Sequence, residues 1–168
     1  YLNILKVDRE NEVKVSFWLE DNKMINEDFI VVSIGASRRR QEKCLRKEVW
    51  IETLNKLADM KKNVVVVYAQ WEQESVMKIL KYVSKDIKTF CPENGLIDLS
   101  ALISKAKLFI GIDSGTMHLA ASLGIKCIAL YGNTDPSQIG PRPLQNHIII
   151  KKNSAKDIIA SDILENIK

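Results

Sequence analysis

The sequence is poor in cysteine and histidine. Its three cysteines, Cys44, Cys91 and Cys127, lie far apart and form no C-x-x-C pair. An odd number of isolated cysteines favours free thiols in a reducing compartment over a disulfide scaffold. The two histidines, His118 and His147, are too few for a dedicated His/Cys metal cage. We therefore predict that the chain binds no metal ion and needs no cofactor.

Signals of several other protein classes are also missing. No apolar run approaches the roughly 20 residues that span a bilayer, and the mixed, charged N-terminus differs from a signal peptide. The sequence contains neither a G-x-S-x-G elbow nor a P-loop, which disfavours a serine hydrolase of that type and a Walker NTPase. It shows no internal repeat or low-complexity segment. Because the chain starts at Tyr1, we expect it to be a fragment of a longer protein.

Positive charge is concentrated in one region of the chain. The formal net charge is only +4, but Arg38–Arg40, Lys43, Arg46 and Lys47 lie close together. A basic loop attracts phosphate, nucleic acid or an anionic membrane surface, although a plain solvated loop explains the three arginines equally well. Few aromatic residues interleave with these charges, so we predict no nucleic-acid partner.

The order of apolar and polar segments predicts an α/β fold. Residues 1–28 are polar and mixed, and we interpret them as a linker or edge segment with a short strand over 13–18. From residue 29 to 168, strands alternate with helices. The expected strands are 29–34, 64–68, 87–90, 108–112, 126–131 and 147–150, and the expected helices are 47–60, 73–83, 98–105, 116–124 and 154–167, with a loop over 133–143. This alternation predicts a Rossmann-like parallel sheet with helices on both faces.

The most informative segment runs from Phe109 to Ala121. An apolar strand ends at Asp113-Ser114-Gly115, and a helix with small residues follows. The first amides of a helix lack internal partners and carry positive potential, so they form a site for anions. Asp113 and His118 add an acidic and a titratable group, and Thr116 adds a hydroxyl. The alternatives are that Asp113 and Ser114 only cap the helix and that His118 is structural.

Three further candidate residues follow neighbouring strands. Ser37 and Lys43 lie between the first strand and its helix, where a lysine can act as a point charge on a phosphate. Glu72 follows the second strand, where a carboxylate can accept hydrogen bonds from ribose hydroxyls. Solvent exposure of Lys43 and a favourable helix-dipole contact of Glu72 are the competing interpretations.

These motifs resemble glycosyltransferase family 9, the bacterial lipopolysaccharide heptosyltransferases. The segment Asp113–Ala121 is similar to the D-[ST]-G-x-x-H-x-A-A motif of that family, and residues 132–136 are similar to its G-x-T-x-P loop. Lys43, Glu48 and Trp50 match its K-x-W-P-x-E-x-W motif, in which Leu45 and Arg46 replace the first Trp and the Pro. Glu72 matches an acidic residue after a G-G-P turn, which here lacks glycine. The resemblance covers residues 29–150.

The resemblance implies the carboxyl-terminal, donor-binding half of a GT-B glycosyltransferase, with residues 29–168 binding the nucleotide sugar. The donor implied is ADP-heptose, and the reaction is a metal-free inverting transfer to the lipopolysaccharide inner core. Implied donor contacts are Ser37, Lys43, Glu72, Asp113, Ser114, Gly115, Thr116 and His118, of which Lys43, Asp113 and His118 are the catalytic candidates. The general base and most of the acceptor site are expected in the amino-terminal half, so this chain alone is expected to be inactive.

The same resemblance implies a cytoplasmic enzyme, with contact to the inner face of the inner membrane left open. The sequence is also compatible with three other functions. The chain can belong to a GT-B transferase or epimerase that uses a UDP-sugar, or it can be a non-catalytic module that binds a nucleotide sugar. It can also be a Rossmann-like domain with no ligand at this edge of the sheet.

Overall fold

The structure is a computed structural model that describes residues 9–35, 39–85 and 87–167. Ser37 lies outside the described residues, so its predicted role in donor binding stays a prediction. None of the helices in the described ranges combines the length and the apolar character that crossing a membrane requires.

Six parallel strands form one sheet in the order β3-β2-β1-β4-β5-β6. The strands are β1 (Phe29–Ser33), β2 (Asn63–Val67), β3 (Lys88–Phe90), β4 (Leu108–Ile112), β5 (Cys127–Tyr131) and β6 (Ile148–Lys151). Each overlaps a segment that the sequence predicts as a strand. The strand order reverses between β1 and β4, and ligands of open α/β sheets bind at the carboxyl ends of strands beside such a reversal.

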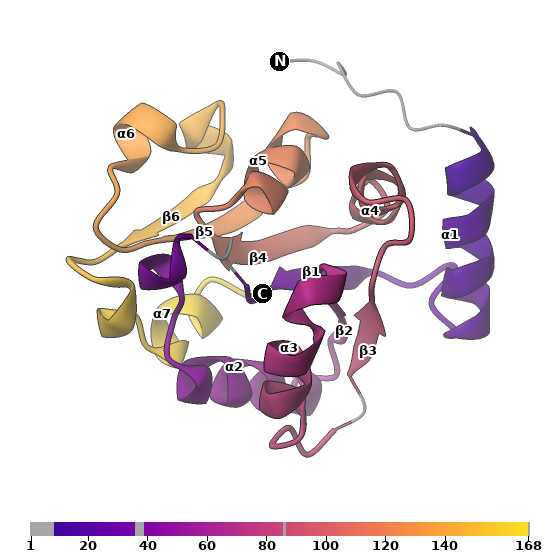
Figure 1. The fold of residues 1–168 in the computed structure, drawn as a ribbon, viewed down its shortest axis with the longest axis horizontal. Coiled ribbons are helices and arrows are strands. Elements are labelled where there is room, and N and C mark those ends of the chain that lie inside the picture. The colour runs from indigo at the N-terminus through magenta and orange to yellow at the C-terminus, as the bar shows by residue number, and fades with distance from the viewer. Residues whose placement is uncertain (1–8, 36–38, 86, 168) are drawn as a thin grey trace.

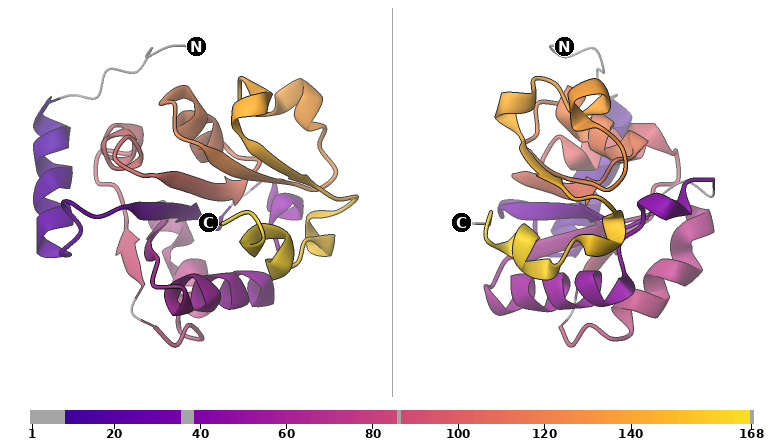
Figure 2. Two further views of the ribbon diagram at one scale, coloured as in Figure 1. Left: turned by 180° about the vertical axis from the view of Figure 1, so that it is seen from behind. Right: turned by 90° about the vertical axis from the view of Figure 1, so that its left-hand side faces the viewer.

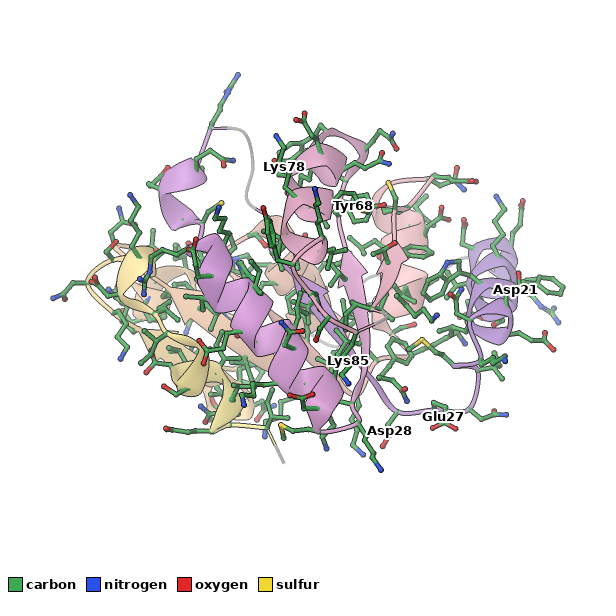
Figure 3. All side chains as sticks on the ribbon, turned by 90° about the horizontal axis from the view of Figure 1, so that it is seen from below. Asp21, Glu27, Asp28, Tyr68, Lys78 and Lys85 are labelled. Atoms are coloured by element: carbon green, nitrogen blue, oxygen red, sulfur yellow. The ribbon has the colours of Figure 1, made fainter. Side chains whose placement is uncertain are left out.

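Helices cover both faces of the sheet, as predicted (Figures 1 and 2). The helices are α1 (Arg9–Asp21), α2 (Lys47–Asp59), α3 (Gln73–Leu80), α4 (Leu96–Ile103), α5 (Gly115–Ser122), α6 (Pro136–Ile139) and α7 (Ala160–Leu164). The short 3-10 helices are η1 (Gln41–Lys43), η2 (Gln70–Glu72), η3 (Leu144–Asn146) and η4 (Ala155–Asp157). One face packs against α2, α3 and α7, and the other against α1, α4 and α5. Figure 3 shows α2 lying across the first face.

Alternation within the strands produces two separate apolar cores. In β1, Ile30 and Val32 point to the α2 side, and Val31 points to the α4 side. Successive side chains of a strand face opposite sides, so a strand buried on both faces must be apolar throughout. The fully buried Trp50 and Leu54 of α2 fill the first core. Cys127 is fully buried in the second core, and burial raises the pKa of its thiol to about 12.

The strand predicted over residues 13–18 is wrong, because this part of the expected linker or edge segment lies within helix α1. Val13, Val15 and Phe17 alternate like a strand, but only Val15 is buried, and Phe17 is 63% exposed. The buried positions Val15 and Leu19 are four residues apart, which is helical spacing. The helix packs on α4.

Two other segments differ from the predicted pattern. The loop expected over 133–143 contains α6, which starts at Pro136 and is capped by Asp135, whose carboxylate accepts the N–H of Ser137 at 2.8 Å. The helix expected over 154–167 is divided into η4 and α7. Ser154 is the predicted cap, but it caps the 3-10 turn of η4. The sequence analysis therefore omits helix α6, although Asp135 before Pro136 is a helix-start signal, and it makes the terminal helix too long.

Candidate functional site

The candidate site lies where β1 and β4 end side by side. The two strands are paired over Ile30–Ser33 and Leu108–Gly111. The chain leaving β1 leads through η1 to Lys43, and the chain leaving β4 continues into Asp113 and helix α5. This is the reversal in strand order where the fold class predicts a ligand site. The sequence placed Lys43 and Asp113 after different strands, and the topology brings them together.

Asp113 is the centre of a side-chain network that joins three loops. Its carboxylate is 5% exposed, and its Oδ2 accepts hydrogen bonds from Lys43 Nζ at 2.5 Å and from Thr134 Oγ1 at 2.9 Å. Lys43 Nζ also donates to the main-chain oxygen of Asp113 at 3.2 Å. On the other side, His118 Nε2 lies 3.6 Å from Asp113 Oδ1. One buried carboxylate therefore orients a lysine and a histidine.

The network keeps Asp113 ionised. Burial alone would raise the pKa of this carboxyl group, but the contacts with its three side-chain neighbours and the charge of Lys43 outweigh burial and lower the pKa to about 2. A carboxylate with such a low pKa is a poor proton acceptor at neutral pH. Asp113 is therefore suited to positioning Lys43 and His118 and is not suited to serving as a general base.

We expect the Asp113 network to make a measurable contribution to acid stability. The pKa of Asp113 falls from an ordinary value of 3.8 to about 2 in the folded chain, so its contribution is present above about pH 4 and is lost as the pH falls toward 2. At neutral pH it amounts to about 2 kcal/mol. Urea unfolding across this pH range should show a smaller loss of stability for Asp113→Asn than for the unmodified chain. Asp59→Asn, which removes an exposed carboxylate at the end of α2, is the control, and an equal pH dependence in Asp113→Asn and the unmodified chain would contradict the assignment.

The N-cap residue of α5 does not cap the helix with its own side chain. Ser114 occupies the N-cap position, but its side chain makes no capping hydrogen bond, and its buried hydroxyl has no partner among the described residues. Asp113 is engaged by Lys43 and Thr134. The capping interpretation therefore does not describe these two side chains. The first amides of α5 remain available to an anion, beside the ammonium group of Lys43.

Gly115, the first residue of α5, borders open space. A Cβ built at this position meets no atom within 4 Å, and the backbone does not have a positive φ. Neither strain nor packing in the described fold therefore requires glycine here. Thr116 follows it with a partly exposed side chain.

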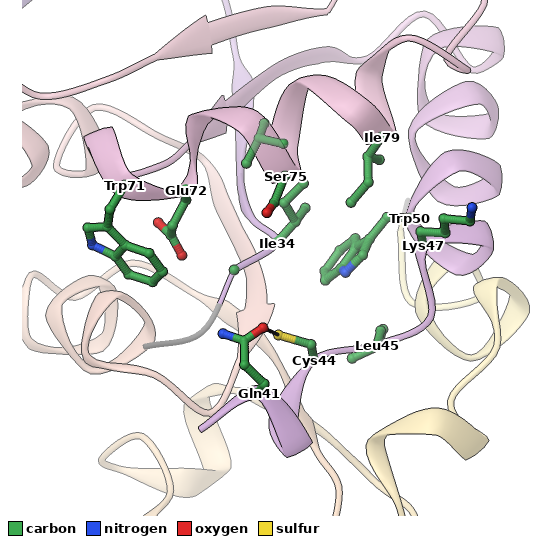
Figure 4. A pocket seen from close by; sticks show the side chains of 12 residues that line it. Ile34, Gln41, Cys44, Leu45, Lys47, Trp50, Trp71, Glu72, Ser75 and Ile79 are labelled. Atoms are coloured by element: carbon green, nitrogen blue, oxygen red, sulfur yellow. Dashed lines mark hydrogen bonds between the residues drawn. The ribbon is translucent and has the colours of Figure 1, made fainter. Parts of the chain in front are cut away.

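Glu72 lies in a neighbouring pocket of about 180 Å³ between α2 and α3. Figure 4 shows Glu72 facing this pocket together with Gln41, Trp71 and Ser75. Burial raises the pKa of Glu72, an effect that the N–H of Ala69, bonded to Oε2 at 2.8 Å, opposes. Gln41, the first residue of η1, lines this pocket, and Lys43, the last residue of η1, contacts Asp113. The Glu72 pocket and the Asp113 network therefore lie on either side of η1.

Sequence reasoning missed two members of this site. Thr134 appears as a turn residue in the sequence, whereas its hydroxyl completes the Asp113 network. Gly35 belongs to the loop after the first predicted strand and has no predicted role of its own, but a Cβ there would stand 1.9 Å from Glu72 Oε1. The G-x-T-x-P pattern was the available signal for Thr134. The contact between Gly35 and Glu72 had none, because it depends on how closely two loops approach.

The whole described domain matches a protein family model. The model for glycosyltransferase family 9 (heptosyltransferase) covers residues 6–168. The chain belongs to glycosyltransferase family 9. It is 29% identical over 101 residues to lipopolysaccharide heptosyltransferase 1 of Escherichia coli K12, covering 60% of this chain and 31% of that protein. It is 35% identical over 78 residues to lipooligosaccharide heptosyltransferase 2 of Campylobacter jejuni, covering 45% and 24%.

Solved structures of heptosyltransferases share this fold. E. coli ADP-heptose LPS heptosyltransferase II superposes with a TM-score of 0.79 at 24% identity, over 96% of this chain and 51% of that one. E. coli heptosyltransferase WaaC with ADP gives 0.74 at 23% identity, over 83% and 43%. The chain therefore corresponds to about half of each of these heptosyltransferase structures. The predicted α/β, Rossmann-like fold and the predicted heptosyltransferase family are both confirmed.

Proposed function

We propose that this chain is the donor-binding half of a heptosyltransferase that transfers heptose from ADP-heptose to the inner core of lipopolysaccharide. The observation that carries the proposal is the Lys43–Asp113 pair at 2.5 Å beside the uncapped N-terminus of α5. A cation and free helix amides at one point suit a diphosphate. The relative whose structure is described with ADP supports an adenine nucleotide.

The residues divide the binding of the nucleotide sugar between them. Lys43 and the amides of Ser114, Gly115 and Thr116 hold the diphosphate and stabilise its developing charge as the sugar departs. Asp113 positions Lys43 and His118 and does not itself accept or donate a proton in the reaction. On the far side of η1, the carboxylate of Glu72 accepts hydrogen bonds from the ribose hydroxyls.

The reaction is an inverting transfer. A hydroxyl of the acceptor attacks the anomeric carbon from the face opposite the diphosphate, the glycosidic bond forms, and the bond to ADP breaks. The proton of that hydroxyl goes to a general base in the other half of a GT-B enzyme, since the low pKa of Asp113 makes it unsuitable. The three free cysteines agree with a cytoplasmic enzyme, and contact with the inner membrane is part of the same hypothesis.

Calorimetric titration with ADP and with UDP tests the donor site. We expect ADP to bind, and we expect Lys43→Ala to weaken it at least about tenfold, because a charged hydrogen bond to phosphate is worth about 1.5–3 kcal/mol. Lys78→Ala is the matched control, since Lys78 is 71% exposed and pairs with Glu74 on the outer surface of α3. A preference for UDP would favour a different GT-B enzyme. Equal binding by the Lys43 and Lys78 variants would overturn the proposed site.

A further inference from the structure

A second pocket borders the Asp113 network, between α5 and the loop that carries α6. Its volume is about 490 Å³. Helix α5 contributes His118 and Ser122 to one wall, and Gln138 and Arg142 come from the opposite wall. The two helices lie close together at the top of Figure 1 and of both views in Figure 2. The donor site described above uses none of this pocket except His118.

The fixed charge on the described lining of this pocket is positive. His118 and Arg142 are the lining residues that can carry positive charge, and none of the described lining residues is a carboxylate. Arg142 Nη2 donates to the main-chain oxygens of Ser137 at 2.5 Å and Gln138 at 3.5 Å. The guanidinium is therefore held by main-chain carbonyl groups. Within the described ranges no acidic side chain pairs with it, so its charge is available to a ligand.

His118 connects the pocket to the donor site. Its Nε2 lies 3.6 Å from Asp113 Oδ1, and its side chain, which is 44% exposed, also lines the pocket. A group bound in the pocket would therefore lie one side chain away from the network that positions Lys43. This is close enough for it to belong to the same reacting complex as the donor.

We propose that this pocket binds a carboxylate or phosphate group of the saccharide acceptor. An arginine fork recognises both groups by paired, charge-assisted hydrogen bonds. The side chains of Ser122 and Gln138 supply neutral partners for neighbouring hydroxyls. The identification of the ligand as the acceptor rests on the proposed function, whereas the anion site rests on the pocket alone. With this anion site, the donor-binding half of the enzyme would also contribute to the recognition of the acceptor.

The test is an NMR titration of the chain with glucuronate, glucose 6-phosphate and glucose, with and without saturating ADP. We expect the side-chain signals of Arg142 and His118 to shift with the charged sugars, and we expect glucose to bind at least about tenfold more weakly. The two charged sugars distinguish a carboxylate site from a phosphate site. Saturation with ADP blocks the α5 amides, so binding that persists belongs to the pocket.

Two variants keep the proposal falsifiable. Arg142→Gln should weaken the charged sugars at least about tenfold, while Arg9→Gln, the same change on α1 at the opposite edge of the molecule (Figure 1), should not. Gln138→Glu places a repelling charge in the pocket without removing the Arg142 anchor, and should weaken binding even if Arg142→Gln fails to fold. Equal binding of glucose and the charged sugars, or unchanged binding in Gln138→Glu, would overturn the anion site. Loss of ADP binding alone would overturn the donor proposal and leave the anion site standing.

Discussion

Asp113→Asn is expected to lower turnover at least about a hundredfold in an enzyme that carries both GT-B halves. The carboxylate holds Lys43 at 2.5 Å and lies 3.6 Å from His118. An amide of the same shape keeps the volume but loses the charge that orients the ammonium group. Steady-state kinetics with donor and acceptor measures the effect. Because Asp113 acts through Lys43, binding of ADP should weaken along with turnover.

Two variants in the segment after β5 provide turnover rates with which Asp113→Asn can be compared. Thr134→Val removes one hydrogen bond to Asp113 Oδ2 and should lower turnover by about tenfold, as expected for a single bond of about 1 kcal/mol or slightly more. Ser137→Ala removes a hydroxyl that bonds to Asp135, and it should leave turnover unchanged. If Asp113→Asn turns over at the rate of Ser137→Ala, the network has no role in the reaction.

Gly115→Val is expected to weaken ADP binding at least about a hundredfold while leaving the fold intact. A Cβ at this position meets nothing within 4 Å in the described structure, so the added side chain starts in the space where the diphosphate would approach the α5 amides. The cost to the helix itself is small, within about 1 kcal/mol on the propensity scale. Calorimetry with ADP, together with urea unfolding, separates binding from stability.

Gly132→Ala is the comparison variant, because it is expected to lower the stability of the fold. A Cβ at Gly132 would stand 2.4 Å from the main-chain nitrogen of Ala155. Such a contact forces the backbone of two segments apart, which typically costs about 1–3 kcal/mol. The Gly115 variant should therefore lose affinity without losing stability, and the Gly132 variant should lose stability. ADP binding that survives in Gly115→Val would show that no ligand approaches the start of α5.

The sheet and the position of the site were predictable because they depend on local signals. Apolar runs bounded by turns predicted every strand, and strands alternating with helices predicted parallel pairing, so the ends of β1 and β4 were expected at one edge. The start of helix α5 directly after β4 was predictable for the same reason, whereas the binding of an anion by this helix start stays a prediction.

Features that depend on tertiary contacts were harder to predict from the sequence. Helix α1 was misread because Phe17 is exposed, so the apolar alternation around it did not mark a buried face. The Lys43–Asp113 pair joins residues 70 positions apart, and the bond from Thr134 to Asp113 joins residues 21 apart. No local pattern encodes such separations. Only the strand order decides that these loops meet.

That separation also fixes the order in which the site can be assembled during synthesis. Lys43 leaves the ribosome long before Asp113, and the hydroxyl of Thr134 is added last of the three. A nascent chain ending at Leu123 would already contain β1 to β4 and α5, but its key carboxylate would lack one of its partners. Strands β1 to β5 therefore precede the completed Asp113 network, which can form only when the loop after β5 has emerged, and β6 follows it.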